Sequence, residues 1–524
     1  VGSTQFIYVV DMRMDYALVG RPALRAWGID VEGVAQALGK QLADRTAEDR
    51  DALARLPRDD GGAVDDAADS EDPFDSLFVE YSVDTSDYDG VSGTPAATPD
   101  GTTRADDELQ DAVDDMLQRA LDNGLEPHLH AELSKLVHSL DMWRLQLRPG
   151  DVAIVEPYRV TLKPDARPCR AHVRTFGAVQ KEALTQELNK LVAAAVIRPV
   201  STSLWSSPAF VVPKPGDSNW RLVADFRKVN SQIVPLALSL PNPTDLFSGL
   251  AGSTCFGQLD LSKMFFQIPV HPDTGMIYVL MGANGELFAG ETGMMGPTDM
   301  PAVANDRLGK TLADANVRTF VKMWIDDMLL HASTQQEYVA RLEQVLLALH
   351  AANWKLNPAK VTLYATVVTF CGRVVSPDGV SADPARVQGL RDAPSPRTVA
   401  DVAHWYGAFS WLRAHVPGFA SSVAPIADWL EAAYKATGSR KKSKAKRHLA
   451  KDHGWDSRMD AAFDHAKEAL DRLILLTHPD PDWSVLLATD ASDDGWGATF
   501  FLYAPSLAHV PLLERRYGVI AVLS

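Results

Sequence analysis

The sequence predicts a mixed α and β protein of two to four domains, and three observations lead to this. The chain has 524 residues, more than one hydrophobic core usually organises. Strand-like and helix-like patterns succeed one another from residue 152 to the end. An acidic stretch with few large apolar side chains, residues 59–104, separates this part from a short patterned segment at the N-terminus.

The bulk composition is that of an ordinary globular protein, with 46% hydrophobic residues. No apolar run is long enough to span a membrane, so we expect no membrane partner. The first residues, VGSTQFIYVV, show no secretory signal, and the three cysteines form neither a zinc motif nor a disulfide framework. We therefore expect an intracellular protein, in the cytoplasm or the nucleus. We interpret both ends of the sequence as cut from a longer chain.

The negative charge is concentrated in one segment. Residues 59–115 contain 19 Asp and Glu and one basic residue, so this segment carries −18 in a chain whose total is −17. The remainder is near neutral and can present a basic cleft to nucleic acid. The clearest basic run, RKKSKAKRHLAK at residues 440–451, has seven Lys and Arg. We interpret it as a solvated loop, with contact to nucleic-acid phosphates as the alternative.

The N-terminal part alternates between patterned and unpatterned segments. FIYVV and ALVGRPALRAWGIDV, within residues 1–35, predict short strands and a helix. Residues 59–104 bury too little apolar surface to offset the entropy of ordering, which predicts a disordered linker. Helical periodicity resumes near Asp106. Four leucines then share one face of a predicted helix: Leu129, Leu133, Leu136 and Leu140.

Several strands and one long helix are predicted downstream. AFVVP and WRLVADF read as strands around a polar turn, KPGDSN, and CFGQLDL as a strand that ends near Asp260. TFVKMWI and MLLHA flank Asp326 and Asp327, and WSVLLATDAS carries Asp490. TQQEYVARLEQVLLALHAA predicts an amphipathic helix capped by Thr334. Its apolar face comprises Tyr338, Leu342, Val345, Leu346 and Leu349.

Two adjacent carboxylates, Asp326 and Asp327, interrupt the apolar run KMWIDDMLL. Two anions among apolar neighbours repel each other and lose hydration unless a cation compensates. A hairpin turn is one explanation, because Asp tolerates turn geometry. The other is a metal site, in which a third carboxylate on a neighbouring strand completes the ligands of two Mg²⁺ ions. Asp260, in QLDLSKMFF, is the candidate.

Two cations lie upstream of these acids, in KPGDSNWRLVADFRKVN. Lys214 and Arg221 could hold a triphosphate without competing for the metals. The alternative for each is a surface charge on a hairpin.

The order of these motifs, over residues 156–430, resembles the reverse transcriptase of gypsy-type LTR retrotransposons. GQLDLSKMFFQIPV resembles the palm motif with the first catalytic Asp, and MWIDDMLL the box with the Asp pair. The lead-in of the family is similar to EPYRVTLKPDARPCRA, and its fingers motifs are similar to VIRPVSTSLWSSPAFVVPKPGDSNWRLVADFRKVN. The segment leading into the primer grip and thumb is similar to KLNPAKVTLYATVVTFCGRVVSPDGVSADPARV, and the connection to WLRAHVPGFASSVAPIADWL. YALVGRPALRAWGIDV resembles the end of a retropepsin-like protease, and LLATDASDDGWGATFFLYAP the opening hairpin of a ribonuclease H domain.

The resemblance implies an α+β fold of the right-hand polymerase type, with fingers, a palm on an antiparallel sheet and a thumb, plus partial flanking domains. The implied organisation is as follows: a protease remnant at residues 1–35, an acidic, largely disordered linker at 36–125, the lead-in, fingers and palm at 126–375, the thumb and connection with the basic loop at 376–480, and a truncated ribonuclease H-like domain at 481–524.

The implied activity is that of an RNA-directed DNA polymerase, which adds dNTPs to the primer 3′-OH of an RNA or DNA template-primer. Two Mg²⁺ ions, or Mn²⁺ in their place, are the implied cofactors. Other parts of the same polyprotein, within a retroelement particle, are further implied partners. Asp260, Asp326 and Asp327 correspond to the catalytic carboxylates, and the carbonyl of Leu261 to a further metal ligand.

Further roles follow from the same resemblance. Lys214 and Arg221 correspond to the triphosphate-binding pair, and Met295 to the turn beneath the nucleotide. Phe265 corresponds to the aromatic gate that excludes a ribose 2′-OH, and Lys360 to a proton donor for pyrophosphate. The primer grip corresponds to Phe370, Cys371, Gly372 and Arg373. For Phe265 and Phe370, ordinary core packing is the alternative.

Some positions depart from the family pattern. Trp324 replaces the commoner Tyr before the Asp pair, and Met294-Met295-Gly296 replaces a Pro-Phe-Gly or Pro-Gln-Gly turn. This change weakens the expected grip on the nucleotide. An inactive retroelement remnant, which binds nucleic acid or has no activity, is therefore the alternative function.

Two carboxylates elsewhere resemble other hydrolase sites. Asp273-Thr274-Gly275 has the tripeptide of aspartic proteases, but Pro272 and Met276 do not suit that buried loop and favour a turn. Asp490 corresponds to the first ribonuclease H acid, but Ala521 and Leu523 stand where a second acid is expected. Ribonuclease activity is therefore not expected, and a nuclease centred on Asp490 is the weakest alternative.

Overall fold

The computed structural model describes residues 100–523, except 173, 214–219, 238–245, 481, 493–494 and 511–514. The predicted protease remnant and most of the predicted linker lie outside the described residues. The chain divides into two compact units. The N-terminal unit contains the described residues up to Phe247 and Gly252–Cys371, and the C-terminal unit contains Ser248–Ala251 and the residues from Gly372 onward. Both units combine helices with antiparallel pairs of strands, so the predicted α+β class is confirmed.

A four-stranded antiparallel sheet forms the centre of the N-terminal unit. Its order is β7 (Val321–Trp324), β8 (Asp327–Ala332), β4 (Cys255–Asp260) and β9 (Thr362–Ala365). The two strands predicted beside the Asp pair and the strand predicted to end near Asp260 are therefore confirmed.

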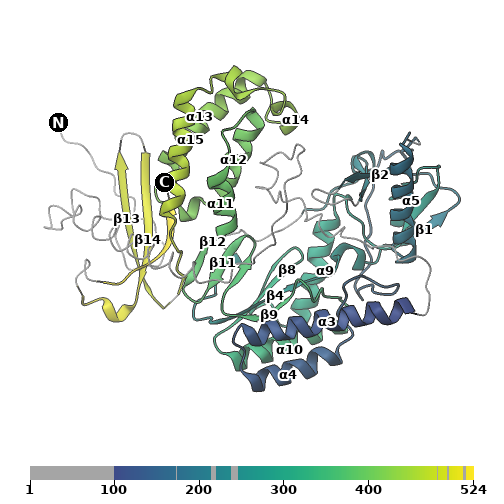
Figure 1. Cartoon of the computed structure of the whole chain (residues 1–524), viewed down its shortest axis with the longest axis horizontal. Helices are drawn as coiled ribbons and strands as arrows, with labels where there is room; N and C mark the ends of the chain where they lie inside the picture. The colour runs from purple at the N-terminus through teal and green to yellow at the C-terminus, as the bar shows by residue number, and fades with distance from the viewer. Residues whose placement is uncertain are drawn as a thin grey trace. The chain divides into compact units, whose positions relative to one another are not determined.

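Helices cover one face of this sheet (Figure 1). α10 (Gln335–Ala351) packs on β8 and β4, and α4 (Pro127–Ser139) and α9 (Met300–Asp314) pack on α10. Thr334 caps α10 by accepting a hydrogen bond from the backbone N–H of Glu337 at 3.2 Å, as predicted. The predicted apolar face of α10 is buried in full.

Gly257 lets α10 approach the sheet closely. A Cβ atom at this position would lie 1.9 Å from the Tyr338 hydroxyl oxygen and 2.9 Å from the Thr362 carbonyl oxygen. The Tyr338 hydroxyl fills that space and donates a hydrogen bond to the Leu363 carbonyl oxygen. Glycine is therefore required here by the approach of a side chain rather than by its backbone conformation.

The expected linker boundary at residue 125 is wrong. Residues Asp100–Asp122 form α3, which packs on β9 within the N-terminal unit. Four apolar residues of α3 are buried: Val113, Met116, Leu117 and Ala120. Their spacing places them on one side of the helix, while the acids that dominate the composition face solvent. The helix therefore belongs to the folded unit despite its acidic composition.

A second sheet of the N-terminal unit carries the upstream strands. Its order is β1 (Ile197–Val200), β6 (Leu287–Gly290), β5 (Leu280–Met281), β2 (Ser207–Pro213) and β3 (Trp220–Ala224). α5 (Ala178–Ala193) packs against β1, β2 and β3. The strands predicted for AFVVP and WRLVADF are confirmed as β2 and β3.

The N-terminal unit also contains two short helices, α8 and η3. Asp273-Thr274-Gly275 lies in α8 (Pro272–Gly275), a single helical turn rather than a protease loop. η3 (Met264–Gln267) follows β4 directly, after Lys263 adopts a left-handed φ of 49°.

The C-terminal unit combines a helical part with a small sheet. A hairpin of β11 (Arg373–Ser376) and β12 (Gly379–Ala382) precedes α11 (Pro384–Asp392), α12 (Val399–Trp411), α13 (Phe419–Thr437), α14 (Lys442–Ala445) and α15 (Ser457–Glu468). Trp405 is fully buried among them and stacks on Phe409, with ring centroids 4.9 Å apart.

The small sheet consists of β13 (Ser484–Ser492), β14 (Gly495–Tyr503) and β15 (Gly518–Leu523) in antiparallel order. The strand predicted for WSVLLATDAS is confirmed as β13. Among the helices that the structure describes in either unit, none has both the length and the apolar character to cross a membrane.

Candidate active site

Two of the predicted acids face each other across neighbouring strands. Asp260, the last residue of β4, pairs with Asp327, the first residue of β8. Residues paired in this way on antiparallel strands project from the same face, with Cα atoms ~4.5–5.5 Å apart. Leu259 and Met328, the next pair along, project from the opposite face and are buried in the core. The alternation of the strands thus places both carboxylates on one face and their apolar neighbours on the other.

A glutamine on the acid-bearing face contacts one of these carboxylates. Gln258 lies two residues before Asp260 and therefore shares its face. Its side-chain amide donates to Asp327 Oδ1 at 3.5 Å. Gln258 was not among the residues predicted from the sequence, although alternation along β4 places it on the same face as Asp260.

The hairpin between β7 and β8 carries the third acid. Trp324 pairs with Asp327, so Ile325 and Asp326 form a two-residue turn. Ile325 has a φ of 54°. A positive φ at the first turn position is typical of type II′ turns, where glycine is usual. A β-branched residue there is strained, and such strain often occurs at functional sites. The predicted turn is confirmed.

A lysine lies beside the first acid. Lys360 Nζ is 3.8 Å from Asp260 Oδ2, and the Asp260 side chain is 14% exposed. The backbone explains this proximity, because the N–H of Asn357 donates to the Asp260 carbonyl at 3.1 Å. The N–H of Lys360 in turn donates to the Asn357 carbonyl. The segment that carries Lys360 is thereby joined to the end of β4.

The segment after Asp260 enters the core. Leu261 is fully buried and forms a bridge with Leu356. Phe265 lies in η3, is 5% exposed, and belongs to the main core cluster of the unit. The packing alternative for Phe265 therefore has direct support, and a gating role would act from a ring that is nearly buried.

The predicted nucleotide-binding residues lie on other elements. Arg221 is on β3, opposite Val212, and Lys214 lies outside the described residues. Met295 is half-buried, and the next residue, Gly296, has a φ of 110°.

Asn230 is a residue that the sequence analysis missed. Its amide donates to the Gly296 carbonyl at 2.9 Å, and its Oδ1 accepts from the N–H of Thr298 at 3.3 Å. This asparagine ends α6 (Arg227–Asn230) and ties the Met294–Gly296 turn to that helix.

The four predicted primer-grip residues are divided between the two units. Phe370 ends β10 (Val368–Phe370), is fully buried, and contacts the Phe247 ring at 6.2 Å between centroids. Cys371 and Gly372 have φ values of 50° and 69°, and the division between the units falls between them. Arg373 belongs to the C-terminal unit, where its Nη1 lies 2.9 Å from His415 Nε2. The packing alternative for Phe370 thus has direct support.

The donor chemistry of the acids suits a magnesium site. Mg²⁺ binds through one or two carboxylates together with substrate phosphates. Asp260 and Asp327 supply such carboxylates from one face, and Asp326 adds a third from the turn. Asp260 already has a cation, Lys360, within contact distance. Within the described part of the chain, however, no three His, Cys, Asp or Glu side chains are gathered as a ready-made metal site.

Asp490 lies on β13, opposite Gly497 of β14. Its side chain is outside the described residues, so its predicted correspondence to a ribonuclease H acid stays a prediction.

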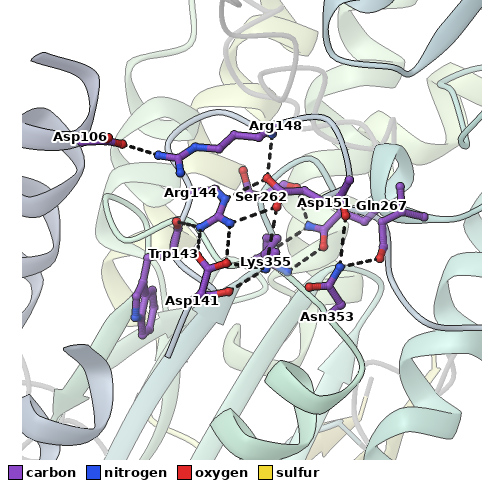
Figure 2. Close-up of polar contacts among 12 residues, drawn as sticks. Asp106, Asp141, Trp143, Arg144, Arg148, Asp151, Ser262, Gln267, Asn353 and Lys355 are labelled. Atoms are coloured by element: carbon purple, nitrogen blue, oxygen red, sulfur yellow. Dashed lines mark hydrogen bonds and ion pairs between the residues drawn. The ribbon is translucent and has the colours of Figure 1, made fainter. Parts of the chain in front are cut away.

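Figure 2 shows a buried ionic cluster formed around Arg144, Asp151 and Lys355. Arg144 is 5% exposed, and its Nε donates to Asp151 Oδ2 at 2.9 Å. Arg144 also binds Asp141, whose pKa this hydrogen bond lowers. Lys355 Nζ donates to the Asp141 carbonyl at 2.6 Å. This cluster could not be predicted from the sequence, because its members show no periodic pattern along the chain.

Comparison with known proteins identifies two families within the chain. Residues 212–375 match the family described as reverse transcriptase (RNA-dependent DNA polymerase). Residues 455–510 match the RNase H-like domain found in reverse transcriptase, which starts well before the boundary expected at residue 481. Residues 212–375 are therefore similar to a reverse transcriptase domain, and residues 455–510 to an RNase H-like domain.

Relatives with similar sequences are viral and transposon polyproteins. The chain is 28% identical over 291 residues to the Gag-Pol polyprotein of Avian reticuloendotheliosis virus, which covers 53% of this chain and 25% of that protein. It is 26% identical over 328 residues to the retrovirus-related Pol polyprotein from transposon gypsy of Drosophila melanogaster, with 60% and 30% covered. The chain thus spans less than a third of the length of these relatives.

Solved structures with the same fold include foamy viral protease-reverse transcriptase. A complex of its dRH form with double-stranded DNA has a TM-score of 0.65 at 20% identity and covers 79% of this chain and 67% of that chain. A complex with an RNA/DNA hybrid has a TM-score of 0.63 at 20% identity, with 79% and 51% covered. The fold is therefore that of a right-hand polymerase, as expected.

Proposed function

We propose that this chain is an RNA-directed DNA polymerase of a retrotransposon, which extends a primer 3′-OH with dNTPs and releases pyrophosphate. The observation that carries the proposal is the pairing of Asp260 with Asp327 on one face, beside the turn that holds Asp326, within the region that matches the reverse transcriptase family. Carboxylates near one end of a sheet could hold the two metal ions of such a phosphoryl transfer together with the substrate phosphates.

Asp260, Asp326, Asp327 and the carbonyl of Leu261 would hold two Mg²⁺ ions, or Mn²⁺ in their place. When bound, the metals activate the attacking hydroxyl and stabilise the charge on the leaving pyrophosphate. Gln258 donates to Asp327 and helps to orient its carboxylate. Lys360, next to Asp260, would provide the proton that the leaving pyrophosphate takes up.

The incoming nucleotide would be bound by residues from several separate segments of the N-terminal unit. Arg221, together with Lys214, would pair with the triphosphate, since guanidinium and ammonium groups both bind phosphate. Phe265 would limit the space at the sugar 2′ position. Met295 would lie beneath the base in the turn that Asn230 holds in place.

The template-primer would be bound in part by the basic segment 440–451 of the C-terminal unit. The cations of segment 440–451 are exposed, and Ala445 and Ala450 anchor this segment in the core of the C-terminal unit. The structurally similar foamy viral proteins form complexes with double-stranded DNA and with an RNA/DNA hybrid, which supports nucleic acid as the partner. Phosphate contact is the chemistry that this segment offers.

The domain boundaries proposed for the whole chain follow from these assignments. The lead-in, fingers and palm begin with α3, near residue 100, and the thumb and connection follow from residue 376. Residues 1–35 would be the end of a protease and the intervening acidic residues a linker. The protein would work inside the cell with the other parts of its polyprotein, in a cytoplasmic particle or in the nucleus.

One feature favours the alternative of an inactive remnant. The turn at Met294-Met295-Gly296 lacks the proline of the family pattern, and its backbone is held through Gly296 and Asn230 instead. A flexible methionine beneath the nucleotide would bind it less firmly.

Primer extension by the purified chain, on an RNA template with Mg²⁺, distinguishes an active polymerase from an inactive remnant. We expect extension by the wild type. We also expect it from the control variant Asp273→Asn, which removes an acid of α8 whose side chain is 86% exposed. We expect Asp260→Asn to lose extension almost completely. Extension by Asp260→Asn at the wild-type rate would refute the proposed site, and a folded wild type without extension would favour the remnant.

A further inference from the structure

Gln267 makes three hydrogen bonds from a completely buried side chain. Its Nε2 donates to the Ser262 carbonyl at 2.7 Å and to the Lys355 carbonyl at 2.9 Å. Its Oε1 accepts from the N–H of Lys355 at 2.7 Å. Figure 2 shows Gln267 beside Ser262 and Lys355, at the edge of the ionic cluster. All the hydrogen-bonding capacity of the amide except one acceptor lone pair is thus used inside the protein.

These bonds close a loop that starts at the first acid. Gln267 lies seven residues after Asp260 and ends η3. Its side chain reaches back to Ser262 near the start of the loop, and the N–H of Ser262 donates to the Lys355 carbonyl at 2.9 Å. Phe265 lies within this loop. The hydrogen bond from the Gln267 amide to Ser262 therefore joins the two ends of the loop that contains Phe265.

Lys355, the residue to which the Gln267 amide binds, is itself held in place by the ionic cluster. Lys355 is 3% exposed, and its Nζ donates to the Asp141 carbonyl and lies 3.8 Å from Asp151 Oδ1. Asp151 is bound in turn by Arg144. Breaking such a buried network leaves polar groups without partners, which keeps the anchor in one position.

Only a primary amide of this length satisfies the three partners. Two carbonyls need two N–H donors, and one N–H needs an acceptor. A methionine has a similar shape but no donor, and an ionised glutamate would direct a carboxylate at both carbonyls. Leaving buried carbonyls without donors is unfavourable, so the loop would move to find other partners.

We propose that Gln267 is the positioning residue that fixes the Phe265 segment relative to Asp260, and through it the discrimination between deoxy- and ribonucleotides. The sugar part rests on the proposed polymerase function, whereas the positional part rests on the hydrogen bonds alone. Small displacements of a group beside the reacting centre have large effects on rate and selectivity.

The first test compares Gln267→Met with Tyr338→Phe in the full-length chain. Tyr338→Phe removes one buried hydrogen bond, made from α10 on the face of the sheet opposite to Asp260, whereas Gln267→Met removes three. We expect Gln267→Met to lower the ratio of kcat/KM for dNTPs to that for rNTPs by about tenfold. We expect Tyr338→Phe to leave this ratio unchanged. An unchanged ratio in Gln267→Met, or an equal change in both variants, would overturn the proposal.

Gln267→Glu adds a pH readout that a purely structural role would not give. A protonated carboxyl donates once and accepts once, so it replaces two of the three bonds, whereas a carboxylate cannot donate. The nucleotide preference of this variant should therefore recover toward that of the wild type as the pH is lowered. A preference that does not change with pH in this variant would count against the assignment.

The second test needs no polymerase activity. The N–H of Phe266 donates to the Lys263 carbonyl and the N–H of Ile268 to the Phe265 carbonyl, so neither bond is made by the Gln267 side chain itself. In Gln267→Met these two amides should exchange hydrogen at least tenfold faster, with no change in Tyr338→Phe. Unchanged exchange would overturn the positional role. If the wild type does not extend primers, the polymerase proposal fails while this measurement still decides the role of Gln267.

Discussion

Asp260 and Asp327 lie directly opposite each other on β4 and β8, and both project from the same face of the sheet. Like charges that oppose each other in this way are destabilising in antiparallel sheets. The fold therefore tolerates an unfavourable pair where the proposed chemistry needs two carboxylates.

Asp327→Asn should separate stability from activity. The substitution removes the repulsion and keeps an acceptor for the Gln258 amide. We expect the melting temperature to stay the same or rise, while primer extension falls by at least about 100-fold, because the proposed metal site would lose a carboxylate. Differential scanning fluorimetry and primer extension measure the two effects. A clear drop in melting temperature would mean that the pair stabilises the sheet instead.

Ile325→Asn tests the strain in the turn. The φ of 54° at Ile325 costs a non-glycine residue roughly 1–2 kcal/mol, and more for a β-branched one, whereas asparagine tolerates this conformation. The hairpin amides of β7 and β8 should therefore exchange hydrogen more slowly in Ile325→Asn than in Ile325→Val, which keeps the β-branch. Equal exchange in the two variants would show that the turn is not strained.

The elements around the acids could be predicted because their signals are local. Acids embedded in alternating apolar strands identified β4, β7 and β8, and Thr334 with five spaced apolar residues identified α10. α3 was missed in part because its acidic composition concealed the apolar spacing of Val113, Met116 and Ala120. Composition averages over a helix, whereas burial depends on one side of it.

The remaining features depend on contacts between residues far apart in the sequence. Gln267 gains its role from Lys355, which lies 88 positions away. The primer-grip motif is contiguous in sequence, yet Phe370 and Arg373 belong to different units. Periodicity and spacing carry no information on such pairings, so the resemblance could assign roles here but not contacts.

His415→Gln should remove a pH dependence of stability from the C-terminal unit. Burial, and then the nearby Arg373 charge, lower the pKa of His415 to about 3. An unfolded histidine has a pKa of about 6.5, so below that pH the unfolded state binds a proton that the folded state does not. Stability therefore falls as the pH drops from about 6.5 toward about 3, by up to about 1.4 kcal/mol per pH unit.

The measurement is hydrogen exchange at Ile474, whose N–H donates to the His415 carbonyl. Glutamine can donate to the Ile474 carbonyl and accept from Arg373, as the imidazole does. After correction for intrinsic exchange, protection should fall between pH 7 and pH 5 in the wild type and change less in His415→Gln. An equal loss in both proteins would assign the effect to other groups.

The basic segment 440–451 can be tested through salt dependence. Replacing Lys441, Lys442 and Lys444 with Gln should weaken binding to an RNA/DNA hybrid and reduce the slope of log K against log salt by about one to three, since each phosphate contact contributes about 0.9. Arg458→Gln is the control, because this exposed arginine is already paired with Asp456 at 2.8 Å. Fluorescence anisotropy at several salt concentrations gives the slopes. An unchanged slope in the triple variant would leave the segment as a solvated loop.

Phe265→Val tests whether the buried ring also selects the sugar. Phe265 is 5% exposed, and a Cβ atom at Gly293 would lie 2.4 Å from the Phe265 carbonyl oxygen, so the backbone at Phe265 has little room to shift toward Gly293. A ring that fills the 2′ position rejects a hydroxyl by overlap, and valine would open that space. We expect ribonucleotide incorporation to rise strongly while deoxynucleotide use changes less.

The matched control is Phe266→Val, the next residue of η3, with 9% exposure. Both substitutions create a cavity that lowers stability by about 3 kcal/mol, so a general loss of packing affects the two variants alike. Single-nucleotide incorporation with dNTPs and rNTPs gives the preference of each. If Phe265→Val loses both activities in parallel, as Phe266→Val should, the ring serves the core alone. A changed preference in Phe265→Val only would place the ring beside the sugar.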